Sequence, residues 1–409
     1  MTSAPPSSAE GLSPAVRSIG SGTVFAMAVA CAFAVANTYY NQPMMVNMAR
    51  DMSVPETSAG FITTATQAGY TVGLLLLAPL GDIFERRRLI LLVVALLIIA
   101  LLGAGAAPSF GMLLGASFFV GMFSISAQYI IPMAAQLAPP EKRGSVIGII
   151  MSGLLTGILG ARTLAGFVAE YANWRTMFVI AALIMIAIAA LIRLTFPKVA
   201  PTSSLGYGAL MRSLLPLWRA EPVLREATVV AALAFATFNI FWTTLTPHLA
   251  SPELGYGPSV AGLFGLIGMV GAFAATIAGR LADRVPSRQM IGASTLLMLI
   301  SFAVMGVGGH LIIGLVIGVI ILDIALQGVQ ITSQTRIFGL QPNARNRINT
   351  IFMTAYFIGG TAGSLIGTLA WQYNGWRGVS AAGIGIATLG LVLHLLGPRL
   401  FGNKARKQD

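Results

Sequence analysis

One apolar stretch carries an acid and three glutamines at helical spacing. Asp323, Gln327, Gln330 and Gln334 stand at positions i, i+4, i+7 and i+11, so a helix places them in one stripe. Asp323 precedes Arg336 by 13 residues, or about 20 Å along a helix. If Arg336 marks a membrane surface, this carboxyl lies near the middle of the bilayer, where it costs about 2.5–3.5 kcal/mol. Such a group is neutralised by a proton, a cation or a partner side chain.

Arg162 is the cation that falls inside a predicted membrane span. It follows Gly153, Gly157 and Gly160, whose spacing favours close packing of helices. Three roles are open for its guanidinium: pairing with Asp323, binding an anionic group of a substrate, or reaching outward to the membrane surface as a structural residue. Burial favours a neutral carboxyl, and a nearby cation favours a charged one. Asp323 could therefore bind and release a proton; a permanent proton or a static hydrogen bond is the alternative.

Polar and aromatic side chains interrupt two other apolar stretches. Asn37, Tyr40 and Asn41 fall on one face of a helix, and Asn239 and Trp242 repeat this face in the second half of the chain. Amides inside a membrane cost free energy unless they face a cavity or bond to a neighbouring helix. The residues therefore either line a cavity or form hydrogen bonds between helices, which are often worth only about 0.6 kcal/mol.

The composition shows that these residues lie in a membrane protein. Only 9% of the 409 residues are charged, 56% are hydrophobic, and the mean hydropathy is +0.82. Soluble domains carry about 25% charged residues, so this chain cannot cover an aqueous surface. A cytosolic enzyme, a disulfide scaffold and a disordered chain are excluded. The single cysteine, Cys31, lies in an apolar stretch and allows no internal disulfide.

Uncharged stretches of about 20 residues, the length that spans a bilayer, recur along the whole chain. They predict an all-α membrane protein with twelve transmembrane helices in two six-helix bundles. The first set is expected near 21–47, 58–81, 89–107, 110–137, 145–172 and 174–195, and the second near 223–250, 259–281, 289–309, 311–338, 348–373 and 376–400.

The expected domains follow from these spans. They are a cytoplasmic tail at 1–20, a first bundle at 21–195, a connector at 196–222, a second bundle at 223–401 and a tail at 402–409. An even number of spans places both termini on one side, where most of the 25 Lys and Arg residues also fall. Arg50, Arg175 and Arg377 are on the other side. The positive-inside rule thus predicts cytoplasmic termini in a multi-pass protein of the cell membrane, which we expect to be a bacterial inner membrane.

The two predicted bundles repeat each other. A shift of 202 residues places Asn37 on Asn239 and Gly157 on Gly359. The same shift places the pair Trp174-Arg175 on Trp376-Arg377. Duplicated halves of this size are typical of secondary transporters, which hold the substrate between the halves near the membrane midplane.

The loops after the second and eighth predicted spans share a motif. The first loop reads Ala78-Pro-Leu-Gly-Asp82-Ile-Phe-Glu85-Arg86-Arg87-Arg88, and the second reads Gly279-Arg-Leu-Ala-Asp283-Arg284-Val-Pro-Ser-Arg288. In these loops the chain resembles the major facilitator superfamily, whose signature there is G-x-x-x-D-[RK]-x-G-R-[RK]. The second copy keeps the Gly, the Asp, the following Arg and the last basic residue, whereas the first copy departs at Ala78, Ile83 and Glu85.

The resemblance implies roles for the candidate residues. The loop charges would form a conformational latch between helices, or else be a solvated loop that only sets topology. In the superfamily, helices 1, 4, 7 and 10 line the central cavity. The latch candidates are Asp82, Arg86, Arg87, Asp283, Arg284 and Arg288. The cavity candidates are Asn37, Tyr40, Asn41, Gln128, Tyr129, Asn239, Trp242, Gln327 and Gln330.

Two stretches also resemble a bacterial efflux branch, the drug-proton antiporters and arabinose-efflux-like permeases. They are Leu322–Arg336 and Arg345–Gly360. This resemblance implies export of a small organic molecule in exchange for protons, with Asp323 and Arg162 as the coupling candidates. Facilitated or proton-symport uptake is the alternative within transport, and a non-transporting membrane receptor or scaffold is the alternative of another class.

Several activities have no support in the sequence. There is no GxxxxGK[ST] loop for ATP, no CxxC or HExxH motif for a metal, and no nucleophile–base–acid set. We therefore expect no enzyme activity, no cofactor and no metal. The expected partners are a small-molecule substrate, protons and the lipid bilayer. The net charge of +12 is explained by membrane topology rather than by nucleic acid, and we expect a monomer.

Overall fold

The computed structural model describes residues 20–201, 206–268, 285–341 and 344–402, and these residues form helices without strands. Ten helices of the described chain are long and apolar enough to cross a membrane. The last of them, Arg347–Leu400, holds two of the predicted spans. The all-α fold expected from the composition is confirmed.

Eight helices make up the first half of the chain. They are α1 Ser21–Ala36, α2 Asn41–Asp51, α3 Gly60–Leu76, α4 Arg86–Gly105, α5 Phe110–Phe123, α6 Ala127–Leu137, α7 Arg143–Tyr171 and α8 Trp174–Thr195. Short 3₁₀ turns at Glu56–Ser58, Ala78–Asp82, Ser124–Ser126 and Pro140–Lys142 lie between them. Six predicted spans thus become eight helices, because two spans are interrupted.

The interruptions lie inside the predicted spans 21–47 and 110–137, which the structure has as the membrane-spanning segments Ser21–Asp51 and Phe110–Leu137. The first is a turn at 37–40 between α1 and α2. Pro43 has no N–H to donate to the carbonyl of Tyr39, so an unbroken helix would lose this bond. The side-chain amide of Asn37 instead donates to the Phe33 and Ala34 carbonyls, at 2.6 and 3.3 Å. The second interruption is the 3₁₀ turn Ser124–Ser126.

The second half begins with a helix that the sequence did not predict. It is α9, Tyr207–Ala220, within the polar connector. The following helices are α10 Pro222–Leu249, α12 Ser287–Gly308, α13 Ile312–Phe338 and α14 Arg345–Leu400. The predicted span 259–281 begins as a helix at Pro258 and is described as far as Gly268. The backbone of α14 is non-helical at Asn374 and Gly375, where φ is +51° at the glycine, so α14 is two helices joined at the predicted boundary.

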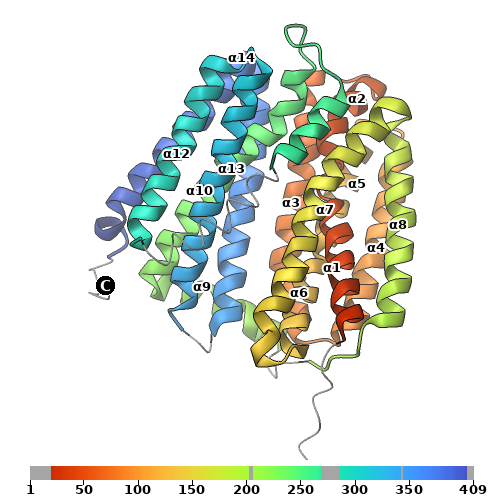
Figure 1. Cartoon of the computed structure of the whole chain (residues 1–409), viewed down its shortest axis with the longest axis vertical. Coiled ribbons are helices and arrows are strands. Elements are labelled where there is room, and N and C mark those ends of the chain that lie inside the picture. The colour runs from red at the N-terminus through yellow and green to blue at the C-terminus, as the bar shows by residue number, and fades with distance from the viewer. Residues whose placement is uncertain (1–19, 202–205, 269–284, 342–343, 403–409) are drawn as a thin grey trace, which may run out of the picture.

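The helices form two bundles that are packed in the same way. Figure 1 shows α1–α8, in red to yellow-green, on one side of the molecule and α10 and α12–α14, in green to blue, on the other. In the first bundle α7 packs on α1, where a methyl group at Gly153 would lie 2.6 Å from the main-chain oxygen of Ala28. In the second bundle α14 packs on α10, where Gly359 lies against the backbone of Ala232. Small residues let both pairs of backbones approach closely.

Hydroxyl groups connect the two bundles along α3 and α14. Thr64 Oγ1 lies 3.0 Å from Ser364 Oγ, which in turn lies 2.9 Å from Thr243 Oγ1 on α10. One to two turns away, Thr71 Oγ1 lies 3.0 Å from Thr361 Oγ1. These bonds join α3 of the first bundle to α14 of the second.

Candidate functional site

The interruption between α1 and α2 brings polar groups to the guanidinium of Arg162 on α7. Arg162 is only 3% exposed, so it does not reach outward to the membrane surface. Its Nε donates a 2.8 Å hydrogen bond to Gln42 Oε1. Its Cζ atom lies 3.7 Å from the centroid of the Trp242 ring and 4.8 Å from that of Tyr39. The two rings stabilise the buried cation by cation–π attraction.

Asp323 on α13 is the second buried charge of this region, at 7% exposure. Its Oδ2 atom has no hydrogen-bond partner within the described residues. Among those residues no basic nitrogen lies within 4.0 Å of the carboxylate. Asp323 and Arg162 therefore do not form a direct ion pair in this conformation.

The two charges nevertheless lie beside the same short helix, Pro258–Gly268. A Cβ atom at Gly265 would lie 3.0 Å from Arg162 Cβ. One turn further, a Cβ atom at Gly268 would lie 3.1 Å from Asp323 Oδ2 and 3.9 Å from Trp242 Cζ2. Trp242 thus contacts the guanidinium and lies near the carboxylate at Gly268. The sequence singled out all three residues, and the structure brings them together.

The amides of the first and seventh predicted spans occupy equivalent places. Asn239 Nδ2 donates to the Phe235 carbonyl at 2.9 Å, as Asn37 does to that of Phe33. Both asparagines are 2% exposed, and Asn37 Oδ1 has no partner in the described residues. Asn41 donates to Thr66 Oγ1 on α3 at 2.7 Å, a bond between helices. Tyr40, at 1% exposure, is buried beside them.

Four cavity candidates have other surroundings. Gln128 Nε2 donates to Tyr70 Oη at 3.1 Å, and Tyr129 Oη donates to the Leu77 carbonyl at 2.7 Å, next to the loop after α3. Gln330 Oε1 accepts from Tyr356 Oη at 3.1 Å, and Gln327, one turn along α13 from Asp323, is half-buried. Tyr129 packs against Gly81, and none of its contacts within the described residues reaches the buried charges.

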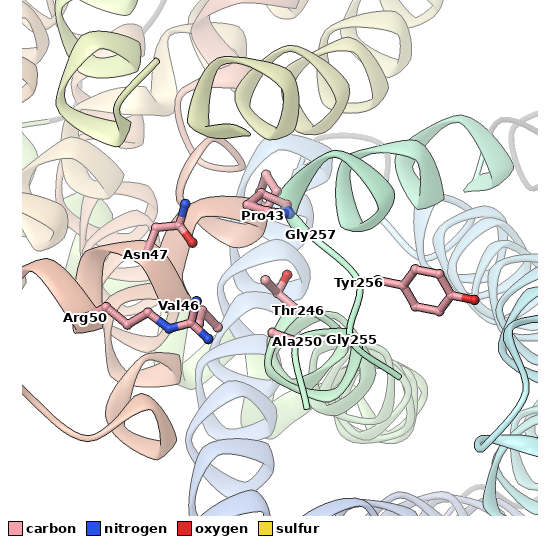
Figure 2. A pocket seen from close by; sticks show the side chains of 10 residues that line it. Pro43, Val46, Asn47, Arg50, Thr246, Ala250, Gly255, Tyr256 and Gly257 are labelled. Carbon is pink, nitrogen blue, oxygen red and sulfur yellow. The ribbon is translucent and has the colours of Figure 1, made fainter. Parts of the chain in front are cut away.

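A pocket of about 240 Å³ opens at the far end of α2 and α10. Figure 2 shows Pro43, Val46, Asn47 and Arg50 of α2 on one side and the segment Gly255–Gly257 on the other, with the Tyr256 ring pointing away from α2. Thr246 lines the pocket and donates a 2.8 Å hydrogen bond to the main-chain oxygen of Gln42. The pocket lining therefore includes a residue bonded to Gln42, whose side chain in turn accepts from Arg162.

The charged loop after α3 is tightly bonded within its own bundle. Arg86 is 4% exposed, and its guanidinium lies 3.3 Å from Asp82 Oδ1 and 3.1 Å from Gln136 Oε1 on α6. Arg87 donates to the Phe196 carbonyl at 3.1 Å. Glu85, which departs from the family motif, caps α4 through the amides of its second and third residues.

The equivalent loop of the second bundle is described only in part. Asp283 and Arg284 lie outside the described residues. Arg288 donates to the carbonyls of His394 and Leu395 at 3.1 and 2.8 Å, so it holds the last turns of α14.

Sequence reasoning missed a second buried acid, Glu226 on α10. Its Oε2 lies 3.1 Å from Arg336 Nη2, and its Oε1 lies 3.4 Å from His394 Nδ1. The other ring nitrogen of His394 lies 2.9 Å from the Arg288 carbonyl. Glu226, Arg336 and His394 are 58 to 168 positions apart, and each resembles an ordinary charge at a helix end, so no spacing in the sequence links them.

Comparison with known proteins agrees with this architecture. The family model described as Major Facilitator Superfamily matches residues 27–340 and 229–408. The chain is 43% identical over 367 residues to the uncharacterized transporter YgaY of Escherichia coli O157:H7, which covers 90% of this chain and 93% of the relative. It is 24% identical to a probable sugar efflux transporter of Helicobacter acinonychis, over 85% of this chain and 88% of the relative.

Solved structures share the fold. A bacterial homologue of the human lysosomal transporter Spinster, inward-facing and unoccupied, superposes with a TM-score of 0.77 at 16% identity, covering 95% of this chain and 98% of that chain. A D-xylose–proton symporter gives 0.73 at 15% identity, covering 92% and 96%. These matches agree with the two-bundle helical architecture and with the loop motif. The chain is a multi-pass membrane transporter rather than an enzyme, and it belongs to the Major Facilitator Superfamily.

Proposed function

We propose that the protein moves a small organic molecule across the membrane by alternating access, with Asp323 as the residue that carries a coupled proton. The buried carboxyl of Asp323 supports this most directly, because its Oδ2 has no partner in the described chain. A buried carboxylate without a direct partner costs several kcal/mol. A proton removes this cost, and a change of surroundings between two conformations then binds and releases the proton.

The first mode of coupling is export of a drug- or sugar-like molecule in exchange for protons. Relatives named as probable sugar efflux transporters support this direction, at 24 and 25% identity. Exchange requires that the proton and the cargo do not bind to the protein at the same time. A neutral or cationic molecule that bonds to the ionised carboxylate of Asp323 satisfies this requirement. Both termini then lie in the cytoplasm of a bacterium, and the protein works as a monomer in its inner membrane.

The second mode is cotransport of the molecule with a proton, and the position of Arg162 favours it. When Asp323 is ionised, the charges of Asp323 and Arg162 balance across the Pro258–Gly268 helix. A proton on Asp323 leaves the Arg162 cation without compensation. An anionic cargo restores the balance, so the proton and such a cargo bind together.

The remaining candidates complete the proposal. The amides and rings at the break between α1 and α2, and their counterparts on α10, contact the cargo. The bonds of Arg86 to Asp82 and Gln136 hold the loop after α3 against α6 in one conformation and release it in the other. The cavity set is Asn37, Tyr40, Asn41, Gln128, Tyr129, Asn239, Trp242, Gln327 and Gln330, and the latch set adds Arg87, Asp283, Arg284 and Arg288.

Purified protein in liposomes that contain a pH-sensitive dye tests this function. Sugars, amphipathic drugs and organic ions are added under an imposed proton gradient to the wild type, to Asp323→Asn and to the exposed control Glu253→Gln. We expect proton movement that depends on one compound, persists in the control and is lost in Asp323→Asn. Equal flux without a gradient and in Asp323→Asn would make the protein a uniporter, and binding without flux would make it a receptor.

A further inference from the structure

The guanidinium of Arg162 is held by a hydrogen bond on one edge and by contacts with two aromatic rings. Its Nε is bonded to Gln42 Oε1 at 2.8 Å, and aromatic rings of Trp242 and Tyr39 lie within 3.7 and 4.8 Å of Cζ. Its two terminal nitrogens, Nη1 and Nη2, make no hydrogen bond or ion pair within the described residues. The N–H donors of Nη1 and Nη2 are therefore available to a group other than the described residues.

Arginine at this place suits a particular kind of ligand. The planar fork donates two parallel N–H bonds to a carboxylate, whereas the ammonium group of lysine is a point charge. Because Gln42 occupies the Nε edge, the pair Nη1 and Nη2 is the edge left for a bidentate contact. A residue that served only to balance Asp323 would lie within ion-pair distance of it, and Arg162 does not.

Two further donors without partners lie next to the guanidinium. Trp242 Nε1 and Gln42 Nε2 are buried, at 2% and 3% exposure of their residues, and neither has a hydrogen-bond acceptor in the described chain. Because Gln42 Oε1 accepts from Arg162, the orientation of the amide is fixed and Nε2 is a donor. Buried donors of this kind are satisfied by hydroxyl or carbonyl oxygens.

We infer that the molecule carried by this protein is a small organic acid, whose carboxylate binds the Nη1–Nη2 edge of Arg162 while its oxygens accept hydrogen bonds from Trp242 Nε1 and Gln42 Nε2. The inference rests on the proposed transport function and selects its second mode. Protonation of Asp323 and binding of the carboxylate to Arg162 each make the other more favourable. A monocarboxylate and one proton carry no net charge, so their joint movement responds to a pH gradient and is indifferent to the membrane potential.

Thermal stability of the full-length protein in detergent tests the carboxylate site. The probes are glucuronate, lactate and benzoate, each compared with its neutral amide. We expect at least one acid to raise Tm while its amide does not. Arg162→Gln raises the acid concentration that gives half of the maximal Tm shift roughly 10- to 100-fold, because a hydrogen-bonded charge pair is lost. Arg162→Lys raises this concentration less. The exposed control Arg193→Gln leaves it unchanged.

Three results would overturn the inference: stabilisation that survives in Arg162→Gln, equal stabilisation by acids and amides, or no stabilisation by any acid. Should Arg162→Gln fail to fold, the double variant Arg162→Gln/Asp323→Asn removes both charges together and must likewise not respond to the acids.

Flux measurements separate this inference from the proposed function. In liposomes, an acid that raises Tm is expected to enter with a proton, at a rate that valinomycin and potassium gradients do not change. If a neutral compound moves protons through Asp323 and no acid responds, the proton-coupled function stands and the carboxylate site fails. If acids bind through Arg162 but their flux is still coupled to protons in Asp323→Asn, the carboxylate site stands and the role of Asp323 fails.

Discussion

Thr246 Oγ1 donates a 2.8 Å hydrogen bond to the main-chain oxygen of Gln42, and this bond joins the two bundles beside the pocket between α2 and α10, which Thr246 lines. The side chain of the same Gln42 holds Arg162. Gln42 thus contacts both the buried cation and the neighbouring bundle. We therefore expect a cargo that displaces or reorients Arg162 to affect this bond between the bundles through Gln42.

Thr246→Val is expected to open the pocket more often, because it removes the bond between the bundles and keeps the side-chain shape. One hydrogen bond is worth about 1 kcal/mol, so the population of the open conformation rises roughly five-fold. The measurement is the labelling rate of Asn47→Cys, a pocket residue, by a membrane-impermeant maleimide, with Cys31→Ala in the background.

Thr244→Val is the matched control for this measurement. Thr244 is equally buried, but its hydroxyl bonds only within its own helix, to the carbonyls of Ile240 and Phe241. The labelling rate should stay at the wild-type value. Equal acceleration by both variants would show that the bond of Thr246 does not hold the pocket closed.

Gln42 substitutions should separate stability from binding. Gln42→Met leaves the Nε of Arg162 without an acceptor, which costs about 1.5–3 kcal/mol and lowers Tm. Gln42→Glu instead supplies a carboxylate, so Tm is retained while the binding of organic acids is lost, because the guanidinium is already neutralised. The check is Tm with and without the acid probes. Strong acid binding in Gln42→Glu would contradict the geometry assigned to Arg162.

The two buried acids should respond differently to the same chemical change. Glu226→Gln removes the buried charge that contacts Arg336 at 3.1 Å and leaves that largely buried guanidinium without its acid, so we expect a loss of about 3–5 kcal/mol. Asp323→Asn keeps the shape of a side chain that has no direct ion pair, so stability should change by less than about 1 kcal/mol. Tm values of the two purified variants decide this; a larger loss in Asp323→Asn would reveal an ion pair that this conformation lacks.

The glycines of α7 should differ in their tolerance of alanine. A methyl group at Gly157 would collide with the backbone of Ala32 on α1, so Gly157→Ala is expected to cost about 1–3 kcal/mol or more. Gly160 has nothing within 4 Å of its Cβ position, so Gly160→Ala should be neutral or stabilise by up to about 1 kcal/mol through helix propensity. The yield and Tm of each variant in detergent measure these effects. Equal losses of stability in Gly157→Ala and Gly160→Ala would mean that α1 and α7 are not in close contact.

The sequence by itself determined the membrane class, the positions of most helices and the duplication. The predicted span 174–195 matches α8 Trp174–Thr195, and 311–338 differs by one residue from α13 Ile312–Phe338. Hydropathy, charge and glycine spacing are properties of consecutive residues, so they can be read without knowledge of the fold. For the same reason the sequence could mark Asp323, Arg162 and Trp242 as unusual residues of their apolar stretches.

Only the tertiary structure decided which of these residues meet. Arg162 contacts Trp242 and Gln42 but makes no ion pair with Asp323 among the described residues, and Glu226 lies against Arg336 and His394. Such contacts depend on the crossing of helices that are far apart in the chain, and periodicity within one helix gives its faces but not its neighbours. The break between α1 and α2 has the same origin: Pro43 weakens the helix locally, and the bonds of Asn41 to α3 and of Gln42 to α7 and α10 hold the interrupted backbone in place.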